Sequence, residues 1–331
     1  MVWGRVIDLQ EIDVFGSNDL NDPMIQIEDI LPKNKKKKGA ITVINDLKIL
    51  RTVQKSDNKK NNEAIIFDPD MIDIPVGAFR KQDLEMIPKR FKDCQESCGL
   101  KDYENIQMPS TLKCQNAQLV VTIKSTADHF EHRQAIRDSW ATKAVDRAVV
   151  VFLVGQPNQS MNQTEKDENG LNIFDQIRVE AFEYSDILLG DYIDSYANLT
   201  VKALSGLKWR NENCPEPEFS LSIDDDTFVD LDELLQVHLN KLPKNQKFIE
   251  CSERTVVHGK VWRDGRWAVS EDIYDQPMYP NYCNGPCYLM PKESSKAIWE
   301  SSQNSPTDLQ ADDAFITGVM RSKAQIPLIQ V

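Results

Sequence analysis

The pattern of apolar and polar positions changes at about residue 113. Before that point short apolar pieces alternate with charged stretches and show no sustained period, and residues 33–38 form a lysine-rich run that reads as a solvated linker. From Gln118 onward, short apolar runs rich in β-branched residues predict buried strands at 119–123, 148–154, 186–189 and 219–223. We therefore expect a stem-like or poorly defined region over residues 1–112 and a folded domain over residues 113–331.

Three segments between these runs place apolar residues at helical spacing. They are residues 129–143, about 171–182 and 195–209. Alternating strands and helices predict an α/β domain with a mostly parallel, Rossmann-like sheet and helices on both faces. Ligands of such sheets bind beyond the carboxyl ends of the strands. The residues that directly follow each strand are therefore the first candidates for chemistry.

Three consecutive carboxylates follow the fourth apolar run. In extended backbone, Asp224 and Asp226 share one face and Asp225 points away. Two like charges about 4 Å apart repel by roughly 4 kcal/mol at an effective dielectric of 20, and a divalent cation would remove this cost. Carboxylate oxygens suit Mg²⁺ or Mn²⁺ and leave positions free for phosphate oxygens. The alternative is a solvated acidic turn before the next helix, but placement after a buried strand favours the metal site.

Other phosphate and metal motifs fit this segment poorly. The phosphatase pattern hhhhDxDx[TV], counted from Asp224, requires Thr or Val where Phe228 stands, and the glycine and terminal glutamate of a calcium-binding EF-hand loop are missing. The sequence also has no P-loop glycine motif. An unrelated metal-dependent phosphoryl-transfer enzyme is therefore the weakest alternative.

Composition limits the partners. The 40% hydrophobic content and six Trp suffice for a packed core. A formal net charge of −13 disfavours nucleic acid and anionic membrane surfaces as main partners, although a nucleotide with a bound cation remains compatible. No window approaches the roughly 18 uncharged apolar residues that a membrane span needs, and the first residues carry too many charges for a signal peptide.

The seven cysteines do not settle the compartment. The pairs Cys94/Cys98 and Cys283/Cys287 have a spacing that zinc tolerates. No histidine accompanies either pair, so disulfides or free thiols are the better interpretation. The four histidines, His129, His132, His238 and His258, form no obvious catalytic pattern.

Five separated segments together resemble the β-1,3-galactosyltransferase family of inverting glycosyltransferases, whose fold is of the GT-A type. They are RQAIRDSW (133–140), DILLGDYIDSYANLTVK (186–202), DDDTFV (224–229), YPNYCNG (279–285) and DDAFITG (312–318). Their order and spacing match the family. The acidic pair of the last segment stands where the family has Glu-Asp-Val, and the chain ends at Val331, before the late histidine of that family.

The resemblance implies a role for each matching residue. Asp226 would ligate Mn²⁺ (or Mg²⁺) that bridges the donor diphosphate, with Asp224 helping to place the metal or the ribose. Asp313 would be the general base that takes the proton of the acceptor hydroxyl; a helix-start acid is the plain alternative. The remaining donor-site residues would be Arg133, Arg137, Asp191, Lys202 and Asp225; for the two arginines an exposed helix face is the alternative.

The resemblance further implies a hexosyltransferase that uses a UDP-sugar, galactose before N-acetylglucosamine, and forms a β-1,3 linkage on a glycoprotein or glycolipid. Inversion needs one carboxylate to activate the acceptor and a cation to stabilise the leaving diphosphate. Family members are type II Golgi membrane proteins, although no membrane-spanning segment is visible here. The alternative is a catalytically silent relative that binds glycans or a partner enzyme.

Two further sets of residues are candidates for glycan chemistry. Trp267 and Tyr282 could line an acceptor groove, because sugars stack on aromatic faces, while burial in a core is equally compatible with their side chains. Sequons at Asn158, Asn162 and Asn198 permit N-glycosylation if the chain is luminal.

Overall fold

The computed structural model describes residues 81–95, 98–100, 103–158, 166–167, 170–243, 245–251, 255–256 and 259–330. All of them belong to one compact unit. The lysine-rich run and the sequon at Asn162 lie outside the described residues.

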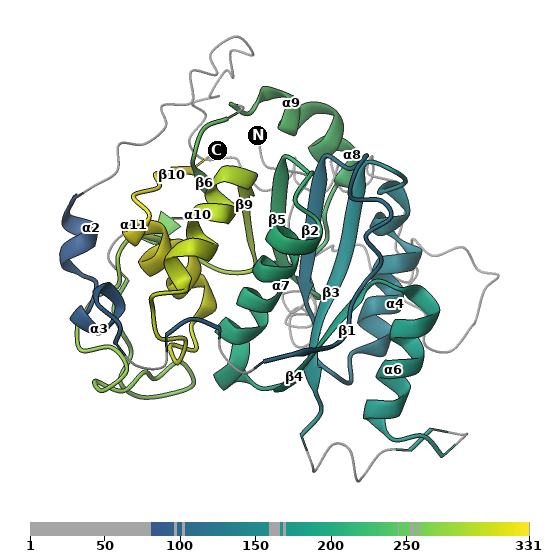
Figure 1. The fold of residues 1–331 in the computed structure, drawn as a ribbon, viewed down its shortest axis with the longest axis horizontal. Helices are drawn as coiled ribbons and strands as arrows, with labels where there is room; N and C mark the ends of the chain where they lie inside the picture. The colour runs from purple at the N-terminus through teal and green to yellow at the C-terminus, as the bar shows by residue number, and fades with distance from the viewer. Residues whose placement is uncertain are drawn as a thin grey trace, which may run out of the picture. The chain divides into compact units, whose positions relative to one another are not determined.

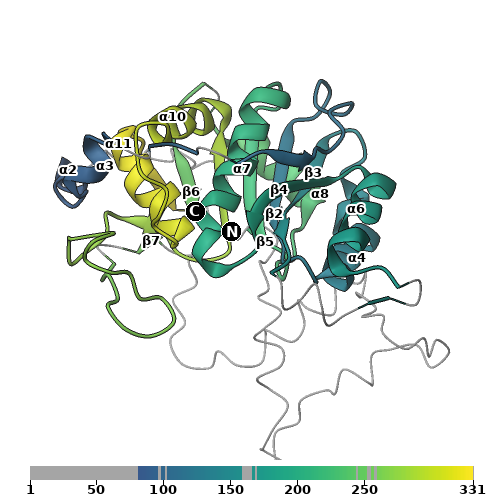
Figure 2. The same cartoon turned by 60° about the horizontal axis from the view of Figure 1, so that its bottom comes forward.

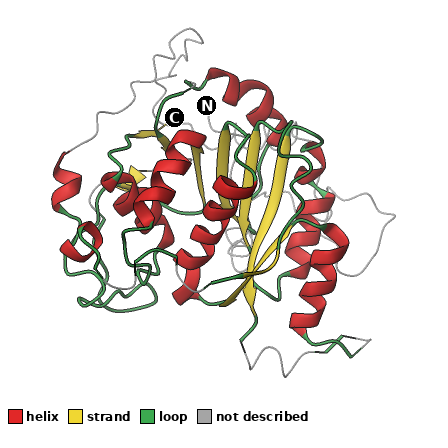
Figure 3. Cartoon of the chain, viewed as in Figure 1, coloured by secondary structure: helices red, strands yellow, loops and turns green. Residues whose placement is uncertain are grey.

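The unit is built on an eight-stranded mixed sheet with the order β1-β4-β3-β2-β5-β9-β6-β10 (Figures 1 and 3). Neighbours among β4, β3, β2 and β5 are parallel, β9 is antiparallel to both β5 and β6, and β1 is an antiparallel edge strand. The strands are β1 (Asn105–Gln107), β2 (Leu119–Lys124), β3 (Ala148–Gln156), β4 (Ile187–Ile193), β5 (Phe219–Asp224), β6 (Ile249–Cys251), β9 (Cys287–Pro291) and β10 (Leu328–Gln330). A separate two-stranded ribbon pairs β7 (Thr255–Val256) with β8 (Tyr282–Cys283).

The four strands predicted from apolar runs are confirmed, as is the mostly parallel arrangement. Both faces of the central strands are buried, which explains why their sequences are continuously apolar rather than alternating. Leu119, Val121 and Ile123 of β2 belong to the cluster that contains the apolar side chains of α4 and α6. Val120 of the same strand belongs instead to the cluster around Trp209 of α7. Helices therefore cover both faces of the sheet.

The larger helices are α4 (Phe130–Asp138), α6 (Ile173–Tyr184), α7 (Leu199–Asn213) and α10 (Lys292–Ser302). Short turns of helix are α2 (Lys81–Glu85), α3 (Lys89–Lys92), η4 (Trp140–Lys143), η5 (Tyr196–Asn198), α8 (Leu231–Glu233), α9 (Leu239–Lys241) and α11 (Arg321–Lys323). Two π-helical segments are η6 (Leu234–His238) and η7 (Ala314–Met320). Figure 2 shows α10 beside α7, on the same side of the sheet.

Close packing of α7 on the sheet depends on Gly206. A β-carbon at this position would approach Leu153 Cδ1 of β3 to 2.6 Å, well inside van der Waals contact. A side chain at residue 206 would therefore require the Leu153 side chain to shift.

The predicted boundary between residues 112 and 113 needs correction for the described part of the first region. Phe91 of α3 is fully buried against the rings of Tyr274 and Phe315. Asp83 of α2 forms a buried ion pair with Arg321 at 2.8 Å. Ile87 and Phe91 thus belong to the second hydrophobic core of the folded domain, Leu84 and Leu100 pack against that core, and β1 belongs to the sheet.

Three disulfides occur in the described part of the chain. They join Cys94 to Cys98, Cys114 to Cys214 and Cys251 to Cys283. The first agrees with the disulfide interpretation of the Cys94/Cys98 spacing. Cys283 of β8, however, pairs with Cys251 of β6, and the buried Cys287 lies outside these three bonds. Among the described residues, no helix combines the length and apolar character that crossing a bilayer requires.

Candidate active site

The candidate site lies where the strand order of the parallel sheet reverses. The chain runs from β2 outward to β3 and β4 and then returns to β5 on the other side of β2. Lys124 and Asp224 end these two neighbouring strands and are register partners. Such a switch point is where open α/β sheets bind ligands, so the position agrees with the chemistry expected after the fourth apolar run.

Lys124 joins two acidic segments that are far apart in the sequence. Its Nζ atom lies 2.9 Å from Asp224 and 2.7 Å from Asp312, two residues before the start of η7. Burial opposes the ammonium charge, yet Asp224 and Asp312 raise the pKa of Lys124 well above its usual value. The ammonium therefore stays charged and holds the two segments together. We refer to this group as the carboxylate cluster: Lys124, Asp224, Asp312 and Asp313.

Asp313 carries the most strongly perturbed carboxyl group of the cluster. Burial and the adjacent charge of Asp312 raise its pKa to about 6. Its carboxylate accepts a hydrogen bond from the backbone N–H of Ala314 at 2.7 Å and another from the backbone of Gly285. Gly285 has a φ of 76°, which favours glycine, so its turn can bring this N–H to the carboxylate. A carboxyl group with a pKa near neutrality, fixed by backbone donors, has the properties of a general base.

Tyrosine side chains surround Asp313. Burial, followed by the nearby charge of Asp313, raises the pKa of Tyr282 to about 12. Tyr282 packs edge-on against Tyr279 with ring centroids 5.9 Å apart. Burial and the charges of Asp313 and Asp312 raise the pKa of Tyr196. Tyr196, Tyr279 and Tyr282 therefore lie near Asp313.

The two predicted acceptor aromatics differ in setting. Tyr282 is half-buried next to Asp313, while Trp267 is 58% exposed on the loop that precedes β8. Gln310 Nε2 donates to the carbonyl of Ala268 at 2.6 Å and so ties this loop to the segment leading to Asp312. Both aromatics therefore belong to segments that meet at the site, and their contact with an acceptor stays a prediction.

The remaining aspartates of the DDD segment take separate directions. Asp225 is buried and accepts hydrogen bonds from Ser125 Oγ at 2.6 Å and from His129 Nδ1 at 2.8 Å. These bonds lower its pKa against the effect of burial. Asp225 thus points away from the partners of Asp224, as its place in the segment predicts. Asp226 is half-buried in the turn after β5, and its role as a metal ligand stays a prediction.

The predicted nucleotide contacts of Arg133 and Arg137 need correction. Arg133 is fully buried and donates to Glu180, to Ser125 Oγ and to the carbonyls of Thr126 and Ala127. Arg137 binds Asp186 through two hydrogen bonds of 2.8 Å and Glu180 through one of 2.7 Å. The N–H donors of both guanidinium groups bind groups of the protein, so the two arginines stabilise the segments around the site. We call this group the arginine network: Arg133, Arg137, Glu180 and Asp186.

Lys202 and Asp191, the other two predicted donor-site residues, also form hydrogen bonds within the protein. The buried ammonium of Lys202 donates to the carbonyl of Ser125 at 2.6 Å and to Asp194 at 2.7 Å. Asp191 accepts from the backbone N–H of Glu104 at 3.1 Å and thereby holds the approach to edge strand β1. Lys202 positions the loop after β2, and Asp191 stabilises the edge of the sheet.

The structure describes the whole sequon at Asn198 and, of the sequon at Asn158, only the asparagine. Asn158 is half-buried just after β3. Asn198 donates from its amide nitrogen to the carbonyl of Ile193 at 2.8 Å, and Thr200 of the same sequon is fully buried. Glycosylation of Asn158 and of Asn198 stays a prediction.

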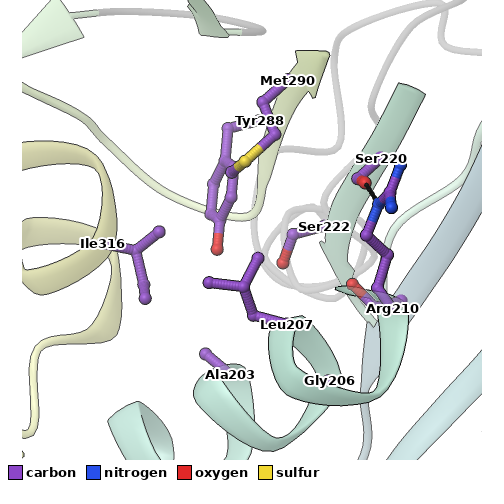
Figure 4. A pocket seen from close by; sticks show the side chains of 10 residues that line it. Ala203, Gly206, Leu207, Arg210, Ser220, Ser222, Tyr288, Met290 and Ile316 are labelled. Carbon is purple, nitrogen blue, oxygen red and sulfur yellow. Dashed lines mark hydrogen bonds between the residues drawn. The ribbon is translucent and has the colours of Figure 1, made fainter. Parts of the chain in front are cut away.

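A small cavity lies behind the site, between α7, β5, β9 and η7 (Figure 4). Figure 4 shows Tyr288 and Ile316 on one side and Ser222 and Arg210 on the other. The space suits about one water molecule and is lined mainly by core residues. It is a packing feature of the core.

Sequence reasoning missed the residues that assemble the site. Lys124 is a charged residue directly after a buried apolar run, in the same position on β2 that Asp224 occupies on β5, and this parallel was the available signal. Ser125 and His129 follow in the same loop and helix start, but nothing in their spacing indicates that they contact Asp225.

Comparisons with known proteins agree with this geometry. The family model for galactosyltransferase matches residues 131–331. The N-acetyllactosaminide beta-1,3-N-acetylglucosaminyltransferase 2 of Homo sapiens is 33% identical over 210 residues, covering 61% of this chain and 50% of that protein. The beta-1,3-galactosyltransferase 1 of Mus musculus is 28% identical over 204 residues, covering 60% and 58%.

A similar relative is the lactosylceramide 1,3-N-acetyl-beta-D-glucosaminyltransferase A of Danio rerio, which is 29% identical over 215 residues, covering 61% of this chain and 54% of that protein. The chain spans about half the length of the curated relatives it matches. Since the family model covers more than half of the chain, including the β5 turn, η7 and the segments that join them, this protein belongs to the galactosyltransferase family.

Proposed function

We propose that this protein is an inverting hexosyltransferase that transfers galactose, or alternatively N-acetylglucosamine, from a UDP-sugar to a glycan hydroxyl and forms a β-1,3 linkage. One observation carries the proposal. Lys124 binds both Asp224 and Asp312, so the acidic turn after β5 and the Asp312–Asp313 pair belong to one site at the switch point of the sheet. Inversion needs two such groups, one for the leaving diphosphate and one for the acceptor.

Asp313 is the proposed general base. With a pKa of about 6 it is mostly ionised at neutral pH and still basic enough to accept a proton from an acceptor hydroxyl. The N–H groups of Ala314 and Gly285 orient the carboxylate, and Tyr196 and Tyr282 shape the space next to it. Together these groups would hold the acceptor hydroxyl toward the donor sugar.

Asp224 and Asp226 are the proposed ligands of Mn²⁺ or Mg²⁺. Their carboxylate oxygens fit such hard cations, and the Asp224 side chain is 41% exposed and so reachable from solvent. Partial burial raises the pKa of Asp224 even though Lys124 opposes this, so a cation would relieve an unfavourable charge. When bound, the cation would stabilise negative charge on the diphosphate. Lys124 would then remain with Asp312 and keep Asp313 in place.

The transferred sugar, the linkage and the acceptor class follow the names of the relatives, which are β-1,3-galactosyl- and N-acetylglucosaminyltransferases and include a lactosylceramide 1,3-N-acetyl-beta-D-glucosaminyltransferase. A glycoprotein or glycolipid is therefore the proposed acceptor. We also propose a luminal Golgi location as a type II membrane protein. Three disulfides within the described residues support an oxidising compartment.

The test is a screen of UDP-sugars against glycan acceptors that end in galactose or N-acetylglucosamine, with manganese or with EDTA. We expect transfer from one UDP-hexose that requires the cation and gives a β-1,3 product. Absence of transfer with every donor, while UDP still binds in manganese, would instead support a silent glycan- or partner-binding relative. Absence of both transfer and UDP binding would contradict both.

A further inference from the structure

Two imidazoles at the start of α4 face the same carboxylate. His129 Nδ1 lies 2.8 Å from Asp225 Oδ2, and His132 Nδ1 lies 3.6 Å from Asp225 Oδ1. The two rings stack with centroids 4.3 Å apart, and the three potential ligand atoms all lie within 4.8 Å of one another. The spacing of three residues within one helical turn brings both histidines to one side of α4, next to the turn after β5.

The carboxylate at the centre of this group is held firmly. Ser125 Oγ donates to Asp225 at 2.6 Å and itself accepts from Arg133 Nη1 at 3.0 Å. Lys202 fixes the carbonyl of Ser125 at 2.6 Å. Hydrogen bonds that orient a carboxylate in this way are typical of the surroundings of metal ligands. The arginine network and Lys202 therefore support Asp225 as a preformed ligand.

A hydrogen bond explains the contact of Asp225 with His129 but not its contact with His132. The His129–Asp225 distance is that of a hydrogen bond, whereas 3.6 Å is too long for one between His132 and the same carboxylate. Ligands of a tetrahedral ion with bonds of about 2.0–2.1 Å are about 3.3 Å apart. The two observed distances lie on either side of this value. The His129 and His132 side chains are 37% and 44% exposed, so a cation in solution can reach them.

We propose that His129, His132 and Asp225 form a second cation site, separate from Asp224 and Asp226, which binds Zn²⁺, Co²⁺ or Ni²⁺ in preference to Mn²⁺ or Mg²⁺. Imidazole nitrogens select these transition ions, whereas the harder ions prefer oxygen ligands. Three protein ligands leave a coordination position open to water or a small ligand. Because Asp225 stands between Asp224 and Asp226, an ion at this site also fixes the turn that carries both. The inference depends on the geometry of the described residues and is independent of the proposed function.

The test is a titration of metal-free, full-length protein without a polyhistidine tag with Co²⁺, followed by visible absorption. We expect one equivalent of Co²⁺ to bind, Zn²⁺ to displace it, and Mn²⁺ at the same concentration to leave it bound. His132→Gln should lower the affinity for Co²⁺ by about 10-fold or more, because it removes a ligand. Asp226→Asn is the matched control: it alters the proposed manganese site in the same turn and should leave Co²⁺ binding unchanged.

Three outcomes would overturn the proposal: no Co²⁺ binding by the wild-type protein, equal binding by the wild-type protein and His132→Gln, or the same loss in Asp226→Asn as in His132→Gln. Thermal unfolding in EDTA verifies that both variants are folded. His132 is half exposed and is not part of the core, so its substitution should leave the melting temperature unchanged.

Discussion

The arginine network and the carboxylate cluster each contain three charged residues from the segments that resemble the family and one from outside them, Glu180 and Lys124 respectively, yet their charge balance differs. In the arginine network, two guanidinium groups face two carboxylates, and short hydrogen bonds satisfy them. In the carboxylate cluster, a single ammonium faces three carboxylates. The positive and negative charges of the arginine network balance, whereas the carboxylate cluster has more negative than positive charge.

This difference separates structural from functional charge. Asp186 and Glu180 raise the pKa of Arg137 against the effect of burial, as expected for a stabilising ion pair. The pKa of Asp313, by contrast, is raised to about 6, because burial and the adjacent charge of Asp312 disfavour its ionised form. Proteins retain such unfavourable charges mainly where a ligand or a reaction uses them. The predictions below test this distinction, from the largest expected effect to the smallest.

Asp313→Asn should reduce transfer by about 10²–10⁴-fold, the range for loss of a general base. The same substitution should stabilise the fold at pH 7.5 by up to about 3 kcal/mol, because a shift from 3.8 to about 6 corresponds to about 1.4 kcal/mol per pKa unit. The sign follows from the raised pKa: the ionised form destabilises the folded state above that pKa, and the stabilisation should vanish at low pH. Steady-state kinetics and urea unfolding in EDTA measure the two effects.

Asp308→Asn is the control for this substitution, since Asp308 is an exposed partner of Arg90. It should change neither activity nor stability by more than the small value of a surface ion pair. An Asp313→Asn variant with wild-type activity would remove the base assignment.

Arg133→Ala should lower the free energy of unfolding by about 3–5 kcal/mol, because it leaves Glu180 buried beside a single remaining arginine. Urea unfolding measures this, and Arg178→Ala on the exposed face of α6 is the control, with little expected effect. A variant that keeps its stability but loses UDP binding would restore the direct nucleotide contact predicted from the sequence.

The rate of transfer, as kcat/KM, should fall as pH decreases through about 6, because Asp313 must be ionised to accept a proton. Lys124→Met should move this limb to higher pH, since the Lys124 ammonium lowers the pKa of Asp313. pH–rate profiles of both proteins test this. A limb that stays in place in Lys124→Met would show that the two groups are not coupled.

Trp267→Ala should raise the KM for the acceptor by about 2–10-fold, the loss of one aromatic stacking contact, and leave the KM for the donor unchanged. Phe182→Ala is the control, because Phe182 of α6 is also an exposed aromatic side chain, with an exposed fraction of 82%. Equal acceptor KM values for the Trp267→Ala and wild-type proteins would exclude Trp267 from the acceptor groove.

The central part of the fold was predictable from the sequence. Buried parallel strands must be apolar on both sides, so β2, β3, β4 and β5 appear as continuous apolar runs that local reading detects. The packing of residues 81–112 was not predictable in this way. The contacts of Asp83 and Phe91 are made with residues more than 180 positions later, and no local period records them.

The sequence predicted which segments form the site, but it did not predict which residues contact one another there. The DDD and DDAF segments indicated which carboxylates are special, because their position after a strand and before a helix is local information. What Arg133 binds depends on Glu180 of another helix, and this pairing could not be read from the spacing of the arginines on α4. For the same reason the pairing of Cys283 with Cys251 appears only in the folded protein.

The most direct test of the account is calorimetric binding of UDP in the presence of Mn²⁺ or EDTA, for the wild-type protein, Asp226→Asn and Asp313→Asn. If the acidic turn holds the cation and Asp313 acts only on the acceptor, UDP should bind in the presence of Mn²⁺ and not in EDTA. Asp226→Asn should lower the affinity for UDP at least about 10-fold, and Asp313→Asn should bind UDP as tightly as the wild type. UDP binding that ignores manganese, or that both variants lose equally, would contradict this division of roles within the site.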